Sequence, residues 1–325
     1  MKKYLVLVFS ILLFVSCKES SEKNERVLTD SSGNINQLTV VIENSLWEGE
    51  VGETIRTNLA AAVDGLPQEE PLFSLSQIPP QTFSGFVRKN RLFLKIEEGD
   101  TNEFRVLNEV YARPQKGVVI RGKNEEALIE QINKQSDSII SIYKETELKE
   151  KQRRIAKGLK DDKKLKENFG LSLKFPTAYR YAKEAKNFSW IRKEIPKGNM
   201  EILIYEVPLS TIEKDTNVIG NIIKMRDSIG KAHIPGPVEG SYMITEEAYA
   251  PYLFETEIDG KFAYETRGTW EVKNAFMAGP FVNYAVKDEK NDRYLILEGF
   301  VFSPSRGKRD NIFELDAILQ SADIK

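Results

Sequence analysis

Cysteine and histidine are almost absent from this sequence of 325 residues, which has one of each, Cys17 and His233. A single cysteine excludes a disulfide within the chain, and these two residues cannot form a His/Cys zinc site. A Ser-His-Asp triad would depend on His233, but no Gly-x-Ser-x-Gly pattern supplies its nucleophile. Walker and dinucleotide-binding glycine motifs and EF-hand loops are also missing. The sequence therefore predicts neither a metal nor a cofactor, and it favours a protein without catalytic activity.

The sequence also lacks an excess of positive charge, since 47 Lys and Arg residues stand against 49 Asp and Glu residues. Proteins that bind nucleic acids usually present a basic face to phosphate, so we expect no nucleic-acid partner. Paired carboxylates occur at Glu97-Glu98, Asp161-Asp162 and Glu246-Glu247, in polar stretches. Such pairs predict acid–base catalysis only if folding brings two carboxylates to a suitable separation.

Only one long apolar run occurs, and it follows Met1-Lys2-Lys3 at the N-terminus. A positive start, an apolar stretch and a small residue at its end are the parts of a secretory signal peptide. The run is too short for a membrane-spanning helix, which needs about 20 residues. The segment Leu13–Cys17 resembles the lipobox of bacterial lipoproteins, with Phe14 where leucine is usual. We therefore predict a signal peptide over residues 1–16 and a lipidated Cys17, bearing diacylglycerol and palmitate, as the first residue of the mature protein.

Residues 17–37 are polar after Cys17 and predict a flexible tether. Two or more acyl chains hold a protein firmly on a membrane. We thus expect an exported protein of the cell envelope whose first partner is the outer membrane. Both the periplasmic and the surface face of that membrane stay open.

Residues 38–165 are predicted to form an N-terminal α+β half. It begins with the strand Leu38–Ile42, and Ser45 and Glu48 then have the spacing of a capping box at the start of a helix. Further strands are expected at 72–75, 86–96 and 118–120. A second, highly charged helix runs from Asn124 to about Lys157, and its solvated face is typical of a connector between two halves. The apolar stripe of the first helix consists of Trp47, Val51, Ile55, Leu59 and Val63.

Residues 166–325 are predicted to form a C-terminal α+β half. Asp259-Gly260 stands between two alternating runs and is a strong hairpin signal. Strands near 261–273, 281–287 and 293–302 would form an antiparallel meander, covered by helices at about 211–229 and 308–321. The predicted fold class is α+β, with antiparallel sheets, helices packed on one face and two halves joined by a long charged helix.

One group of residues in this half is a candidate ligand-binding site. An arginine between acidic residues can recognise a carboxylate or a phosphate. Strand alternation places Glu265, Arg267 and Glu271 on one face and Trp270 on the other. A cross-strand ion-pair ladder explains the same pattern without a ligand. The candidate residues are Arg226, Asp227, Arg267, Trp270 and Glu271.

Five longer motifs are spread over most of the mature chain: Leu46–Gly52, Gly65–Phe73, Ile234–Met243, Arg267–Glu271 and Phe276–Phe281. Together they resemble a family of Bacteroidetes envelope lipoproteins known as the domain of unknown function 4837. The resemblance implies a lipid-anchored envelope protein and brings no activity or catalytic residues. The start of the second half is also similar to the small α+β modules of the PsbP type, a similarity of fold that carries no function.

These observations favour a non-catalytic, lipid-anchored envelope protein that binds a partner protein or an envelope polymer. A second hypothesis is a small-ligand carrier or sensor that uses the face of Arg267, Trp270 and Glu271. A third is a hydrolase of an unrecognised type.

Overall fold

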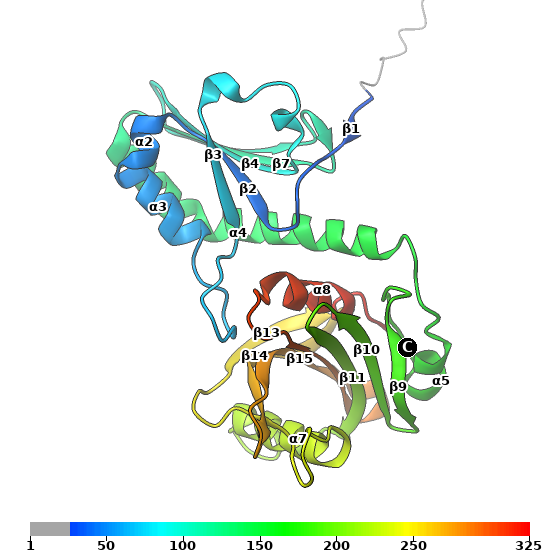
Figure 1. Cartoon of the computed structure of the whole chain (residues 1–325). Coiled ribbons are helices and arrows are strands. Elements are labelled where there is room, and N and C mark those ends of the chain that lie inside the picture. Colours follow the sequence, from blue (N-terminus) through cyan, green and yellow to red (C-terminus); the bar gives the residue numbers. More distant parts are fainter. Residues whose placement is uncertain (1–26) are drawn as a thin grey trace, which may run out of the picture.

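The computed structural model describes residues 27–325, in which two folded units meet along the long helix α4, Glu125–Ile155 (Figure 1). The predicted signal peptide and Cys17 lie outside the described residues. The α+β class is confirmed, because both units combine helices with sheets. Within residues 27–325, no helix has the length and apolar character needed to cross a membrane.

The N-terminal unit is built on a five-stranded sheet in the order β3-β2-β4-β7-β5. The pairs β2–β3, β2–β4 and β4–β7 are parallel, whereas β5 runs antiparallel to β7. The expectation of antiparallel sheets is therefore wrong for this unit. The continuous apolar run Leu38–Ile42 fits the structure, because parallel strands are buried on both faces. The strands are β2 (Gln37–Val41), β3 (Ser74–Ile78), β4 (Leu92–Glu98), β5 (Glu103–Asn108) and β7 (Lys116–Gly122).

The first predicted helix is divided in two, α2 (Asn44–Glu48) and α3 (Glu50–Leu59), with an extended Gly49 between them. The expected cap at Ser45 is wrong, because α2 begins after Glu43, which forms no side-chain cap. A Cβ on Gly52 would lie 1.9 Å from the carbonyl oxygen of Trp47, so only glycine permits this close turn between the helices. Helices α3 and α4 pack on one face of the sheet, and the segment between β3 and β4 covers the other.

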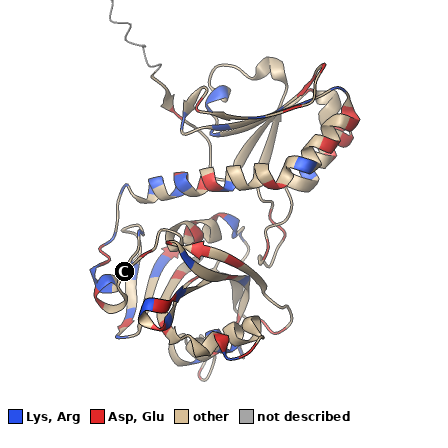
Figure 2. Ribbon diagram, turned by 180° about the vertical axis from the view of Figure 1, so that it is seen from behind, with Lys and Arg blue, Asp and Glu red and all other residues tan. Residues whose placement is uncertain are grey.

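Helix α4 serves both units. Asn124 caps its start, where the side chain accepts a hydrogen bond from the amide of Ala127. Its N-terminal part, up to Tyr143, buries Ile132, Ile139 and Tyr143 against the sheet, and α4 also contacts the last helix of the chain, α8 (Arg309–Leu319). Figure 2 shows both acidic and basic residues along α4. The long charged connector predicted from the sequence is thus also a packing element of the N-terminal unit.

The folded body begins earlier than the predicted tether allows. Strand β1 (Thr29–Asp30) pairs with β6 (Ala112–Arg113). The amide of Asn36 donates to Glu147 Oε2 at 2.7 Å, and Glu147 forms a buried ion pair with Arg91 at 2.5 Å. Residues 29–36 therefore belong to the N-terminal unit, because their polar groups find partners inside it.

The C-terminal unit holds an eight-stranded antiparallel sheet in the order β12-β14-β15-β16-β11-β10-β9, with β13 also paired to β14. The predicted hairpin is present, and both Asp259 and Gly260 have positive φ angles, as a tight two-residue turn requires. The strands are β9 (Arg180–Ala185), β10 (Phe188–Ile195), β11 (Gly198–Pro208), β12 (Tyr242–Thr245), β13 (Tyr252–Ile258), β14 (Lys261–Lys273), β15 (Ala278–Asp288) and β16 (Arg293–Phe302).

Helices cover both faces of this sheet, and not one face as expected. Helix α7 (Val218–His233) packs on one face, the α7 face, over a core that includes Tyr205 and Phe281. Helix α8 packs on the opposite face, the α8 face, over a core that includes Leu297. Two faces need two helices because both sides of the strongly apolar strands β11, β15 and β16 are buried. The smaller elements are η1 (Pro80–Thr82), η2 (Val87–Lys89), α5 (Lys163–Phe169), β8 (Leu171–Ser172), α6 (Ser210–Glu213), η3 (Glu289–Asn291) and β17 (Asp323–Ile324).

Candidate functional site

The five candidate ligand residues are not brought to one site. Arg226 and Trp270 lie on the α7 face, whereas Arg267 lies on the α8 face. Asp227 accepts a hydrogen bond from the amide of Thr245 at 2.7 Å, and Glu271 lies on β14 opposite Ile244. Strand alternation explains the separation, since neighbouring residues of a strand point to opposite faces.

On the α7 face, Arg226 forms a bidentate ion pair with Glu298, at 2.9 and 2.7 Å. Both side chains are 1% exposed, and the guanidinium group lies 3.4 Å from the ring centroid of Phe281. Asn283 donates to the same carboxylate at 2.8 Å. Buried charges persist when they are paired and hydrogen-bonded in this way. Arg226 therefore holds α7 on the sheet and is not available to an external ligand.

A polar row crosses the α7 face beside this pair. The strand registers place Thr266, Asn283 and Glu298 on one rung of β14, β15 and β16. The hydroxyls of Thr266 and Tyr205 and the amide oxygen of Asn283 have no hydrogen-bonding partner among the described residues. Unpaired buried polar atoms cost free energy, so these three atoms lower the stability of the core on the α7 face.

On the α8 face, Arg267 is 16% exposed and donates to Asp316 of α8 at 2.5 Å. It also pairs with Glu265, and the hydroxyl of Tyr284 donates to Asp316. Arg267 is thus ion-paired, but these contacts do not form the cross-strand ladder that the sequence suggested, because its partners lie on the same strand and on α8 and are largely buried. Trp270 is 3% exposed, and its indole N–H donates to the carbonyl of Val301 at 3.3 Å.

The same region receives a loop from the N-terminal unit, residues 60–73, which we call the junction loop. Gly65 has a φ of +79°, and a Cβ there would lie 2.8 Å from the amide nitrogen of Gly268. Glu70 accepts hydrogen bonds from the amides of Lys308 and Arg309, at 2.6 and 3.0 Å. A carboxylate from one unit therefore caps the first turn of a helix in the other. The motifs Gly65–Phe73 and Arg267–Glu271 were identified from the sequence, but not the contact of Gly65 with Gly268 or the cap that Glu70 provides for α8.

Glu201 on β11, a buried carboxyl group, was also not identified from the sequence. It is 2% exposed and accepts from the indole N–H of Trp190 at 2.7 Å. Arg192 lies at 3.3 Å from its other oxygen. Burial raises the pKa of Glu201 to about 8. The available signal was a single glutamate inside the apolar run Met200–Tyr205.

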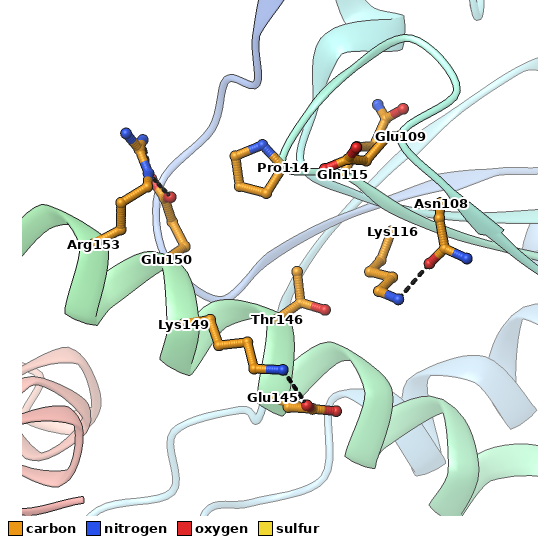
Figure 3. A pocket seen from close by; sticks show the side chains of 10 residues that line it. All are labelled: Asn108, Glu109, Pro114, Gln115, Lys116, Glu145, Thr146, Lys149, Glu150 and Arg153. Atoms are coloured by element: carbon orange, nitrogen blue, oxygen red, sulfur yellow. Dashed lines mark hydrogen bonds and ion pairs between the residues drawn. The ribbon is translucent and has the colours of Figure 1, made fainter. Parts of the chain in front are cut away.

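A cavity of about 290 Å³ lies between α4 and the turn from β5 to β7 (Figure 3). Its charged walls are largely paired with one another. Lys116 donates to Asn108, Lys149 pairs with Glu145, and Arg153 pairs with Glu150 at 2.7 Å. A ligand would have to displace these contacts, so the cavity gives little support to a small-ligand carrier.

A wider, open cavity of about 680 Å³ at the end of β4 includes the paired carboxylates Glu97 and Glu98. Although partial burial opposes it, hydrogen bonds from Lys95 and Arg121 lower the pKa of Glu97. A carboxyl group held ionised in this way does not supply a proton, so Glu97 does not fit the acid of a hydrolase. Among residues 27–325, no three His, Cys, Asp or Glu side chains gather as a metal site would require.

Exposed apolar side chains are unevenly distributed. Nine large hydrophobic side chains are exposed among the described residues, and six of them fall between residues 238 and 276. Two of the six, Tyr252 and Phe254 on β13, have nearly parallel rings 6.4 Å apart. In the described part of the chain, β13 pairs on one side only, with β14. We call the strand with these two rings the β13 edge. The six side chains are Val238, Tyr249, Tyr252, Phe254, Phe262 and Phe276.

Comparison with known proteins assigns the chain to a family. A model described as a domain of unknown function, DUF4837, matches residues 158–321, half of the chain. The chain belongs to the DUF4837 family. A second model, DUF8532, also of unknown function, matches residues 31–156. In this member of the DUF4837 family, the two models therefore meet just after α4.

No curated protein matches the chain. Among solved structures, the chain is similar to the PsbP protein CyanoP from Synechocystis sp. PCC 6803, with 13% identity and a TM-score of 0.32. The match covers 51% of this chain and 89% of CyanoP. A similarity at this level transfers neither fold nor function to the DUF4837 protein.

Proposed function

We propose that this protein is a non-catalytic, lipid-anchored protein of the cell envelope that binds a partner protein at the β13 edge. The β13 edge carries the proposal, because Tyr252 and Phe254 are 50% and 41% exposed on a strand with one unpaired side. Contiguous exposed apolar surface marks interaction sites, and an unpaired strand accepts a strand from a partner through main-chain hydrogen bonds.

The charges on β13 restrict the partner. Glu255 and Glu257 are exposed. They alternate along the strand with Tyr252 and Phe254, which lie on the α8 face, so the carboxylates and the rings lie on opposite faces of β13. Acidic residues on an edge strand oppose pairing between two copies of this chain. A partner strand that alternates apolar residues with lysine or arginine would meet both the rings and the carboxylates. We therefore propose a partner with a basic, apolar strand.

The anchor part of the proposal rests on the sequence around Cys17 and is tested separately. Replacing Cys17 by serine in the full chain should abolish palmitate labelling and release the protein from the membrane fraction. If the C17S variant stays in the membrane fraction, Cys17 is not the anchor.

The partner is tested by cross-linking and pull-down from native membranes with a C-terminal tag. The double variant Tyr252→Ser/Phe254→Ser should lose the partner that the unmodified protein captures. The control Phe276→Ser removes a fully exposed ring from the C-terminal unit outside β13 and should retain it. Equal capture by both variants would exclude the β13 edge. Capture of a glycan that depends on the two rings would identify an envelope polymer as the partner, and turnover of an envelope substrate would contradict the non-catalytic part.

A further inference from the structure

The described chain begins on one side of the N-terminal unit. The amide of Ser31 donates to the carbonyl of Arg113 at 3.0 Å, and the amide of Ser32 donates to the carbonyl of Lys89 at 2.9 Å. Arg154 donates to the carbonyl of Gly33 at 3.2 Å. Residues 31–33 are therefore fixed against three elements: η2, the turn at β6 and the last turn of α4. We call the side formed by these elements the exit face.

The exit face is basic, although the whole chain has a net charge of −2. Figure 2 shows basic residues of η2 and of the last turns of α4 on the side where the chain emerges. Five cations stand against three carboxylates, and one of these, Glu150, is almost fully buried between Arg153 and Arg154. The cations are Arg88, Lys89, Arg113, Arg153 and Arg154, and the carboxylates are Asp30, Glu109 and Glu150.

An exposed aromatic ring belongs to the same segment. Phe86 is 71% exposed and immediately precedes η2. Its neighbour Gly85 has a φ of +52°, and no heavy atom lies within 4 Å of a Cβ placed there. Arg88, at the base of this tip, lies 5.3 Å from the ring centroid of Tyr111. An aromatic tip flanked by cations suits the boundary between lipid headgroups and acyl chains.

The length of chain before the exit face limits its distance from the membrane. If Cys17 carries the lipid, nine residues separate it from Val27. Even fully extended, ten steps of about 3.5 Å span roughly 35 Å, and a flexible chain of this length spans about half of that on average. The tether is thus shorter than the sequence predicted, because the folded body already includes residues 29–36.

From these observations we infer that the exit face lies on the anionic headgroups of the membrane, with Phe86 at the lipid boundary. The C-terminal unit lies on the other side of α4 from the N-terminal sheet (Figure 1), so its β13 edge then lies further from the bilayer than the exit face does. This orientation rests on the proposed lipid anchor. It assigns a function to basic residues that the partner site does not use.

The single cysteine provides a direct test. In the lipidated full chain, Phe86→Cys introduces the only free thiol, and Phe276→Cys introduces a matched one on the C-terminal unit, where Phe276 is fully exposed. Each is labelled with an environment-sensitive fluorophore in vesicles of equal parts phosphatidylcholine and phosphatidylglycerol that contain a lipid-bound quencher. We expect several-fold stronger quenching at position 86 than at position 276.

A charge variant sharpens the test. Adding Arg88→Glu and Lys89→Glu should weaken quenching at position 86, with about a fivefold loss of surface contact per basic residue removed, and should leave position 276 unchanged. Equal quenching at the two positions, or stronger quenching at 276, would overturn the orientation while leaving the anchor intact. Absence of the unmodified protein from the membrane fraction would overturn the anchor and the orientation together.

Discussion

The two faces of the large sheet hold arginine–carboxylate pairs in different surroundings. On the α7 face, the Arg226–Glu298 pair is 1% exposed and joins elements of one unit. On the α8 face, Arg267 is 16% exposed, pairs with Asp316, and lies next to the junction loop. The first face stabilises the C-terminal unit by itself, and the second connects that unit to its neighbour. Both pairs join a helix to the sheet within the C-terminal unit, but only the second lies against the neighbouring unit.

Breaking the pair on the α7 face should have the largest effect. Arg226→Ala leaves Glu298 buried without its counter-charge, and we expect a loss of about 3–5 kcal/mol in the free energy of unfolding. The effect should be confined to the C-terminal unit. Fluorescence in a Trp47→Phe background measures it, since the remaining tryptophans, Trp190 and Trp270, both lie in that unit.

A double variant separates charge from packing on this face. Arg226→Met/Glu298→Leu should recover most of the lost stability, because well-packed apolar residues can replace a buried pair. A single variant that is as stable as the unmodified protein would contradict the assignment of Arg226 to the core.

Glu201, also on the α7 face, predicts a pH dependence. Its pKa in the folded state, about 8, lies above the ordinary value of 4.5. Between pH 4.5 and about 8, Glu201 holds a proton in the folded chain that it has released in the unfolded chain, so the free energy of unfolding falls as the pH rises. The slope is at most about 1.4 kcal/mol per pH unit. Glu201→Gln should flatten the decline in urea titrations from pH 5 to 8, whereas the exposed control Glu239→Gln should not.

On the α8 face, Glu70→Ala should act on the contact between the units. Loss of the cap on α8 costs about 1 kcal/mol, and we expect the two units to unfold at more clearly separated denaturant concentrations. Comparing Trp47 fluorescence with that of Trp190 and Trp270 detects the separation. Coincident transitions in the variant would show that the junction loop does not couple the units.

The smallest effect is expected from the contact between α4 and α8. Lys151 pairs with Glu314 at 2.7 Å, and both side chains are largely buried. Glu314 also pairs with Lys193 at 2.6 Å, so its carboxylate does not lose every counter-charge when Lys151 is removed. Lys151→Ala should therefore change the free energy of unfolding by less than about 1 kcal/mol. A larger loss would place α4, and not the junction loop, as the main connection between the units.

Local patterns in the sequence predicted much of this fold. The start of α4 at Asn124, the part of the apolar stripe formed by Val51, Ile55 and Leu59, and the Asp259-Gly260 hairpin depend on neighbouring residues, and each is present in the structure. The strand β5 was missed because its burial is only partial and its alternation weak. The break at Gly49 was missed because it depends on how closely α2 and α3 pack.

The candidate site was harder to predict, because it too depends on how separate elements pack. Periodicity placed Arg267 and Trp270 on opposite faces of a strand, but it could not show that helices cover both faces. Nor could it pair Glu70 with the amides of residues 308 and 309, or Arg91 with Glu147, because these partners lie far apart along the chain. Contacts of this kind follow from how the elements pack in three dimensions.

The cap that Glu70 provides also sets an order of assembly. The donors on Lys308 and Arg309 are more than 230 residues further along the chain. Because residues nearer the N-terminus are synthesised first, the carboxylate can already be held in its loop when the last helix emerges. The N-terminal unit can then act as a template on which the final helix starts, whereas the C-terminal unit cannot do the same for the first. A chain that began after residue 73 would lack the Glu70 carboxylate, and its last helix would lose this cap.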